Sequence, residues 1–324
     1  MDSEDGLQFA LIFDGQGGAR PAGWEEIRRW TPEQGPLWIH LNYTGAAARR
    51  WLCEESGVPA VYTESLLAEE TRPRVARAGD ALQVTLRGVN HNPGAEPEDM
   101  VAVRLWMEAR RVISSGSRRL MTIADLHTAL EEGQGPRDVA GFLLALAEGL
   151  MDHMGPVVLD LDDVLDELED LLLTTQSAEL HARLSDARRT ALGLRRYMAP
   201  QAEAMAHLQH EETSWLDANH RSHLREIHDQ TVRYTEDLNM ARERAAVTQD
   251  EVNHRLSHQM TRTVYLLTVV ATVLLPLNLI TGALGINVGG IPGASFPWAF
   301  PIVVLLLAGI GASTLWLLRR FKML

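Results

Sequence analysis

A short glycine-containing segment near the C-terminus has the groups needed to hold a hydrated metal ion. Gly285-Ile286-Asn287 offers one amide side chain and backbone carbonyls, and it contains no carboxylate. A ring of such groups from several copies of the chain can hold a divalent cation through its water shell, without the tight binding that carboxylates would cause. The tripeptide alone would also fit an ordinary turn, so its interpretation depends on the residues around it.

The helix expected before this tripeptide carries a stripe of mostly small or neutral polar residues on one side. The members of this stripe recur at spacings of three and four: Thr261, Val264, Thr268, Ala271, Leu275, Asn278 and Gly282. Hydrophobic rings can gate a pore by excluding water, so we expect Val264 and Leu275 to be constrictions in a pore lined by several copies.

Two further sets of residues have the chemistry to bind metal ions. His254 and His258 are four residues apart, which places both imidazoles on one side of a helix near the inner end of the expected pore. Imidazole suits zinc and is a poor partner for magnesium. The acidic run 160–170 contains Asp162 and Asp166 and could sense divalent cations with low affinity. Both sets would also fit an ordinary solvent-exposed helix surface.

The stretch around the tripeptide is long and apolar. No Asp, Glu, Lys, Arg or His occurs from residue 263 to residue 318. A membrane-spanning helix needs about 20 apolar residues, and the stretch supplies two such runs, 263–284 and 297–318. The connection between them is unsuited to a third helix, because each Gly costs about 1 kcal/mol relative to Ala. We therefore expect a transmembrane hairpin rather than two helices buried in a soluble core.

Basic residues flank the apolar stretch at both ends, and the connection has none. They are Arg255, Arg262, Arg319, Arg320 and Lys322. Because cytoplasmic flanks of membrane helices are rich in Lys and Arg, we expect both termini in the cytoplasm and the short loop outside. The acidic N-terminus shows no signal-peptide pattern. The expected location is the inner (plasma) membrane.

Composition limits the possible partners and activities. The formal net charge of −13 argues against a nucleic-acid partner, which would need a basic stripe, and favours cations. The single cysteine, Cys53, excludes an internal disulfide and a cysteine zinc cluster. No phosphate-binding loop, catalytic glycine elbow or HExxH motif is present. We therefore expect neither an enzyme nor a bound cofactor.

Residues 1–155 are expected to form a cytosolic α/β domain with a mixed sheet. Short runs bounded by Gly, Pro and Asn alternate with helical patterns there. The expected strands are 7–13, 37–41, 81–89, 101–108 and 111–114, and the expected helices between them are 24–30, 46–55 and 64–69.

Residues 156–262 are expected to form a helical domain, followed by the hairpin and a basic tail at 263–324. Gly155-Pro156 should interrupt a helical pattern, and Pro200 should break a helix at about 178–208. The next helix starts near Ser214 and runs as stalk and first membrane helix in one piece. A heptad seam along it suggests an oligomeric bundle with the seam around a lumen: Leu224, Ile227, Thr231, Tyr234, Leu238, Ala241, Ala245, Thr248 and Val252.

These C-terminal features together resemble the CorA superfamily of divalent-cation channels and transporters. The resemblance rests on the run 266–287, which ends in Leu284-Gly285-Ile286-Asn287, on the second apolar helix and on the basic tail; segment 194–200 is also similar to a family pattern. The family signature is Gly-Met-Asn. Ile286 replaces the Met, and 288–293 lack the acidic residue common in magnesium members, which is similar to the zinc-transporting ZntB branch.

The resemblance implies an α+β membrane protein that assembles as a funnel-shaped homopentamer. It places Gly285, Ile286 and Asn287 at the pore entrance, with zinc as the transported substrate. A magnesium, cobalt or nickel channel of the same superfamily is one alternative. The other is a membrane-tethered coiled-coil sensor or scaffold, although a tether would not need polar residues along one stripe in lipid.

Overall fold

The computed structural model describes residues 5–69, 71–174, 178–285 and 296–320 of the chain. Ile286 and Asn287 of the expected pore entrance lie outside these residues. The chain divides into two compact units, Met1–Gln249 and Asp250–Leu324.

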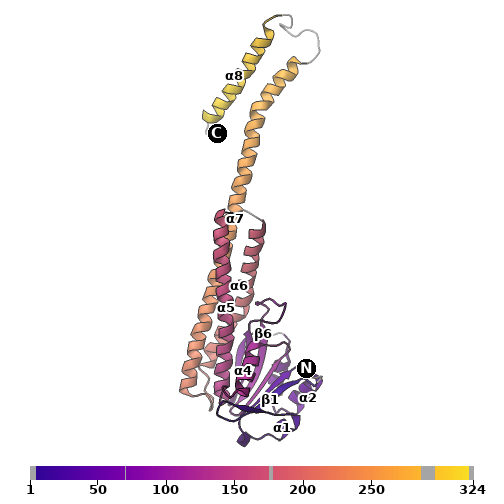
Figure 1. The fold of residues 1–324 in the computed structure, drawn as a ribbon, viewed down its shortest axis with the longest axis vertical. Helices are drawn as coiled ribbons and strands as arrows, with labels where there is room; N and C mark the ends of the chain where they lie inside the picture. Colours follow the sequence, from indigo (N-terminus) through magenta and orange to yellow (C-terminus); the bar gives the residue numbers. More distant parts are fainter. Residues whose placement is uncertain (1–4, 70, 175–177, 286–295, 321–324) are drawn as a thin grey trace. The chain divides into compact units, whose positions relative to one another are not determined.

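Seven described strands form one mixed sheet at one end of the first unit (Figure 1). Its strand order is β2-β1-β3-β7-β6-β5-β4, with β3 and β7 parallel and the other described neighbours antiparallel. The mixed sheet is therefore confirmed. The strands are β1 Leu7–Phe13, β2 Ala19–Pro21, β3 Leu37–Asn42, β4 Arg74–Ala78, β5 Ala81–Gly88, β6 Val101–Glu108 and β7 Arg111–Gly116.

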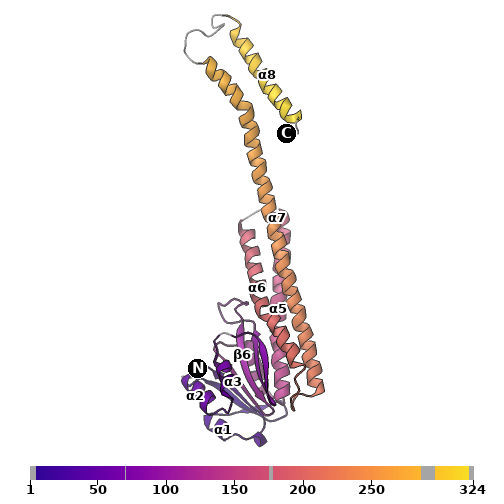
Figure 2. The same cartoon turned by 180° about the vertical axis from the view of Figure 1, so that it is seen from behind.

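Helices cover both faces of this sheet (Figures 1 and 2). On one face the short helices α1, α2 and α3 pack on Leu37, Ile39 and Leu41 of β3. On the other face Trp38 meets Phe142 of α5, with ring centroids 4.7 Å apart. Successive strand residues point to opposite faces, so β3 carries buried apolar residues on both sides. The helices named are α1 Trp24–Arg29, α2 Ala46–Glu54, α3 Ala60–Leu67 and α5 Val139–Thr174; α4 is Met121–Glu131.

Three short elements differ from the sequence-based expectation. The strands β2 and β4 were not expected; they lie at the two edges of the described sheet, where a strand needs no buried apolar face. The helix expected at 64–69 begins earlier, at Ala60, because Pro59 precedes the first turn as its N-cap.

Long helices follow the sheet: α5, then α6 Ala178–Leu208 and α7 Ala218–Leu284. The interruption expected at Gly155-Pro156 and the break expected at Pro200 are both wrong, since these prolines lie inside α5 and α6. A proline removes its own N–H bond to the carbonyl four residues earlier. Those carbonyls belong to Asp152 and Arg196, two residues at exposed positions of α5 and α6.

The heptad seam of α7 packs inside the chain, within the first unit. Its members from Leu224 to Thr248 are buried except for the half-buried Tyr234. The Thr231 hydroxyl lies 3.2 Å from the Met151 sulfur of α5. A Cβ on Gly155 of α5 would lie 2.8 Å from the Tyr234 hydroxyl, which explains a glycine in mid-helix. The expectation that this seam surrounds an oligomeric lumen is therefore wrong, because α5 and α6 already cover it.

In the second unit, the end of α7 and α8 Ala299–Arg320 lie side by side (Figures 1 and 2). α7 is one uninterrupted helix as expected, with Pro276 inside it. Each helix has one stripe that is buried or half-buried. The stripes comprise Tyr265, Val269, Val273, Leu277 and Ile280 on α7 and Val303, Leu307, Ile310, Thr314 and Leu318 on α8.

By length and composition, three described helices could cross a membrane: α5, α7 and α8. The most apolar part of α5 is 56% buried inside the fold, whereas the corresponding parts of α7 and α8 are 6% buried. The apolar side chains of α5 thus belong to the core of the first unit. Those of α7 and α8 need another apolar environment.

Candidate functional site

The predicted pore-lining residues lie on a side of α7 away from α8. Thr261, Val264, Thr268, Leu275 and Asn278 are all exposed, and the half-buried stripe of α7 falls between them in sequence. With 3.6 residues per turn, spacings of three and four keep these residues on one face. The structure therefore brings them together as one continuous surface, which a single chain leaves uncovered.

The polar members of this surface present oxygen atoms outward. The hydroxyl of Thr261 donates to the carbonyl of Ser257, and that of Thr268 to the carbonyl of Val264, each at 2.8 Å. A hydroxyl that donates to its own helix keeps its oxygen available as an acceptor. The Asn278 side chain has no partner within the described part of the chain and offers an acceptor and two donors. These groups can bind the water shell of a cation.

The expected entrance begins where α7 ends. The Gly285 N–H still donates to the carbonyl of Thr281 at 2.9 Å, so it continues the last turn of the helix. A Cβ added to Gly282 would have no other atom within 4 Å. Gly285 thus joins the helix to the rest of the tripeptide, Ile286 and Asn287, which lie outside the described residues.

The structure brings His254 and His258 together as their spacing predicted. Their rings meet edge to face with centroids 4.5 Å apart, and both side chains are exposed. Nearby, Arg255 donates to Glu251 at 2.6 Å, and this bond, with smaller contributions from both histidines, lowers the pKa of Glu251. Among the described residues, no group of three or more His, Cys, Asp and Glu side chains is placed to hold a metal. In one chain the histidine pair is therefore an incomplete site.

The acidic side chains of α5 contact an arginine. Asp162 and Asp166 both form ion pairs with Arg244 of α7, which also contacts Glu169 at 3.0 Å. The hydrogen bonds to Glu169 and then to Asp166 are the main reasons that the pKa of Arg244 is raised. A divalent cation would have to displace Arg244 before it could bind at this arginine–carboxylate cluster.

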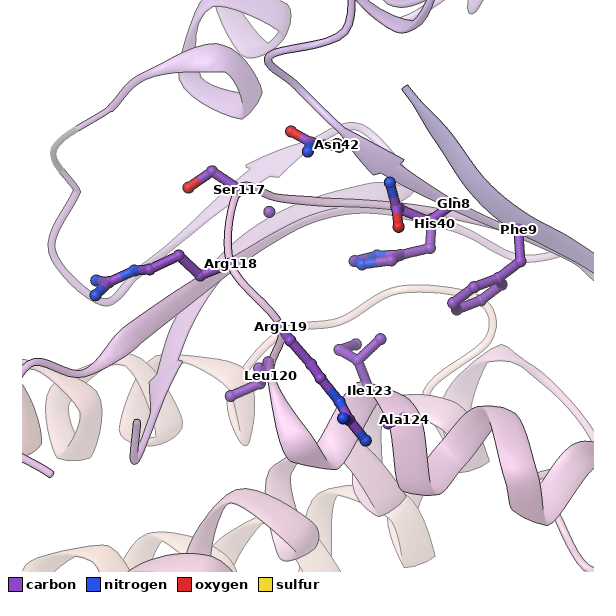
Figure 3. Close-up of a pocket in the computed structure, with 11 residues that line it drawn as sticks. Gln8, Phe9, His40, Asn42, Ser117, Arg118, Arg119, Leu120, Ile123 and Ala124 are labelled. Atoms are coloured by element: carbon purple, nitrogen blue, oxygen red, sulfur yellow. The ribbon is translucent and has the colours of Figure 1, made fainter. Parts of the chain in front are cut away.

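A partly polar cavity of about 320 Å³ lies between β1, β3 and the start of α4 (Figure 3). His40 lines it, with Nδ1 2.8 Å from the Ser114 hydroxyl. Burial, helped by the charge of His127, lowers the pKa of His40 to about 4, so the ring is neutral at pH 7. Arg118 and Arg119 also line the cavity. One imidazole beside two arginines is poorly suited to a cation, and the residues share no sequence spacing that could have indicated the cavity.

Comparison with known proteins decides the family. The model of the CorA-like Mg2+ transporter protein family matches residues 33–320. The chain belongs to the CorA-like family. The divalent cation transporter CmaX of Pseudomonas aeruginosa is 38% identical over 326 residues, covering 99% of this chain and 98% of CmaX. The zinc transport protein ZntB of Pectobacterium carotovorum subsp. carotovorum is 35% identical over 319 residues, covering 98% and 96%.

Solved structures of CorA-like proteins extend this result to the fold. Full-length CmaX superposes with a TM-score of 0.87 at 36% identity, covering 99% of both chains. The CorA magnesium transporter of Methanocaldococcus jannaschii gives a TM-score of 0.80 at 18% identity, covering 96% of this chain and 97% of that one. The predicted resemblance to CorA proteins is therefore confirmed. The CorA-like fold here comprises the N-terminal α/β domain, the long helices and the C-terminal helices.

Proposed function

We propose that this protein transports a divalent cation, zinc in the first place, across the inner (plasma) membrane. The observation that carries the proposal is the uncovered polar surface of α7 within a stretch that has no Asp, Glu, Lys, Arg or His from 263 to 318. Polar residues such as Thr268 and Asn278 are costly in lipid, and those that occur there usually face a pathway or a partner helix. The two similar proteins named above are a divalent cation transporter and a zinc transport protein.

Several copies of the chain are needed to form the pathway. In a single hairpin, α8 covers one side of α7, and the polar surface would face lipid without partners. A homopentamer, as the resemblance implies, would place this surface around a water-filled pore and turn α8 outward. Residues 1–155 and 156–262 would be cytosolic with both termini, and 263–324 would enter the membrane. Native mass spectrometry in detergent tests the assembly: a pentamer is expected, and a monomer would contradict it.

The order of side chains along α7 suggests how an ion would pass. Gly285, Ile286 and Asn287 would capture the hydrated ion at the outer entrance through amide and carbonyl oxygens. Asn278 and Thr268 would then contact its water shell, with Leu275 and Val264 as apolar constrictions about 16 Å apart along the helix. Because no carboxylate lines this part, nothing would trap the ion. His254 and His258 lie near the inner end, where five copies would bring five pairs together.

Zinc is favoured over the magnesium alternative by two features. The segment 288–293 contains no acidic residue, and imidazole, which suits zinc, is present near the inner end. A magnesium, cobalt or nickel channel is the second candidate, because the description of the matched family names Mg2+. The alternative of a tethered scaffold offers no reason for an uncovered polar surface beside an uncharged helix pair.

Ion flux into proteoliposomes tests the function. Zinc, magnesium, cobalt and nickel are supplied separately, with and without imposed pH and voltage gradients. We expect zinc flux well above that of protein-free vesicles, and its loss in Asn287→Ala, which removes the amide acceptors but no backbone hydrogen bond. Asn219→Ala, at the exposed start of α7, is the matched control. Flux of magnesium without zinc would select the second candidate, and no flux of any ion would contradict transport.

Asn287→Asp gives a second test of the entrance. The substitution keeps the size of the side chain and adds one negative charge per copy at close quarters in a ring. These charges would hold a divalent ion tightly or raise one another's pKa. Zinc flux should fall while zinc binding tightens, and the loss should be greater at high pH. Wild-type flux in both Asn287 variants would show that selection occurs elsewhere on α7.

A further inference from the structure

A second polar pocket in the first unit is lined by arginines. It has a volume of about 330 Å³ and lies between the segment after α3, the end of β5 and the middle of α6. Three of its described lining residues are cationic and none is acidic, although the whole chain has a net charge of −13. The lining residues are Thr71, Arg72, Arg87, Arg196 and Tyr197.

The pocket lies where β4 leaves the edge of β5 uncovered. The pairing of these strands ends at Arg74 and Thr85, so Arg87 extends beyond β4. The backbone N–H of Arg87 donates instead to the side-chain oxygen of Gln201 on α6, at 2.7 Å. This bond holds α6 at the end of the strand and leaves the Arg87 guanidinium 4.0 Å from the centre of the Tyr197 ring.

Arg87 is a buried cation whose described hydrogen-bond partners are neutral. Arg87 is 8% exposed. Its guanidinium donates two hydrogen bonds to the carbonyl of Thr71, at 2.9 and 3.1 Å, and one to the carbonyl of Met100, at 2.6 Å. Burial is the main reason that the pKa of Arg87 is lowered, and the charges of Arg118 and Arg196 lower it further. Tyr197 and, less strongly, Asp99 oppose this shift, and Asp99 lies 3.6 Å from Arg118. A buried charge normally has a counter-charge.

Two buried polar atoms beside Arg87 also have no partner in the described part of the chain. They are the hydroxyl oxygen of Thr71 and the side-chain nitrogen of Gln201, in residues that are 8% and 0% exposed. Buried polar groups are almost always hydrogen-bonded. The Gln201 amide nitrogen only donates, so its missing partner is an acceptor, and the Thr71 hydroxyl can also donate to an acceptor. The pocket thus combines excess positive charge with an unused buried donor in its wall.

We propose that this arginine pocket binds a phosphoryl dianion, held by Arg72, Arg87 and Arg196 with the Thr71 hydroxyl. The planar guanidinium fork matches the oxygens of a tetrahedral oxyanion and binds them in pairs. The volume is at the lower end of the range for ligand sites and accommodates one phosphate group. Inorganic phosphate and the terminal phosphate of a nucleotide share this chemistry. The site lies wholly in the first unit and does not depend on the proposed transport activity.

Isothermal titration calorimetry of the full-length protein in detergent and metal-free buffer tests the site with inorganic phosphate, ATP and chloride. We expect phosphate or ATP to bind with one equivalent per chain, and chloride at equal ionic strength to give no saturable heat. Tighter binding of ATP would identify a nucleotide as the source of the phosphoryl group. Binding of phosphate alone would identify inorganic phosphate.

Four variants separate binding at this pocket from binding elsewhere. Arg72→Gln and Arg196→Gln change exposed side chains, and each should weaken the affinity about ten-fold or more. Thr71→Val keeps the shape of the side chain, removes the hydroxyl and should also weaken binding. Arg188→Gln, exposed on the same helix α6, should leave the affinity unchanged. No binding of millimolar phosphate or ATP, equal binding of chloride, or wild-type affinity in both pocket arginine variants would overturn the proposal.

Discussion

Both halves of α7 carry residues repeated at spacings of three and four, and the two repeats lie in opposite environments. Between 224 and 248 the residues repeated every three or four positions are buried or half-buried against α5 and α6, whereas between 261 and 278 the same repeat is exposed. The difference lies in the neighbouring helices, since α8 covers another side of the second half. A heptad-like repeat therefore shows that a helix has a face to be covered, and it does not show what covers that face.

The two units also differ in their charged residues. The first unit holds ion pairs such as the arginine–carboxylate cluster of Arg244, and half-buried titratable groups such as His40. The stretch 263–318 of the second unit contains no Asp, Glu, Lys, Arg or His. Changes of pH and of single charges should therefore act on the folding of the first unit, while neutral substitutions in the second unit should act on ion flux.

The largest contrast is expected from the same substitution in each half of α7. Leu238 is 0% exposed and Leu275 is 67% exposed. Leu238→Ala leaves a cavity in the interior of the first unit and should lower the free energy of unfolding by about 2–5 kcal/mol. Leu275→Ala should leave that free energy nearly unchanged and raise zinc flux by widening a constriction. Denaturant unfolding and vesicle flux are measured on both variants, and equal destabilisation would contradict the contrast.

A smaller effect on stability is expected from pH. His40 has a pKa of about 4 in the folded chain, against 6.5 as its ordinary value. The unfolded chain binds this proton more readily, so its contribution is full above pH 6.5 and is lost as the pH falls to about 4. The loss should reach about 3 kcal/mol, from 2.5 pKa units.

Unfolding of wild type and His40→Gln across this pH window measures the contribution of His40. The variant should lose this part of the pH dependence, because glutamine does not titrate. An unchanged pH profile in the variant would assign the effect to other groups in the first unit.

The arginine–carboxylate cluster should give an effect of about 1 kcal/mol. Arg244→Gln leaves Asp162, Asp166 and Glu169 without their counter-charge, and the value is modest because all four side chains are partly exposed. The freed carboxylates should then bind divalent cations, so magnesium or zinc should restore stability. Arg183→Gln, which removes a partner of Glu167, is the control. No cation-dependent stabilisation in Arg244→Gln would remove Asp162 and Asp166 from the candidate metal ligands.

An element of the fold could be predicted from the sequence where consecutive residues determine it, and could not where residues elsewhere in the chain determine it. The five central strands were predicted because a strand buried on both faces is apolar over several consecutive residues. The edge strands β2 and β4 lack that signal. Pro156 and Pro200 were misinterpreted because the sequence does not show that the residues four positions earlier, Asp152 and Arg196, lie at exposed positions of their helices.

The candidate sites differ in the same respect: some lie within one helix, and one is formed by distant segments. The polar surface of α7 and the pair His254 and His258 depend on spacing within one helix, so the sequence was sufficient to place them on one face. The arginine pocket depends on three segments that are distant in sequence. The side chain of Gln201 accepts a hydrogen bond from the backbone N–H of Arg87 and so joins two of them. No local pattern contains that contact. The seam of α7 was assigned to the wrong partners for the same reason.

The smallest effect on folding is expected from His254 and His258, which lie just after the division between the two units. Both rings are exposed and contact each other, so changing both to Ala should leave unfolding and assembly unchanged. If five copies bring five pairs together near the inner end of the pathway, the double variant should still weaken zinc binding in calorimetry. The matched control changes the exposed His207 and His210 of the first unit to Ala. Zinc affinity that falls equally in both double variants would mean that imidazoles bind zinc anywhere on this surface, whereas a loss confined to His254 and His258 would assign them to the pathway.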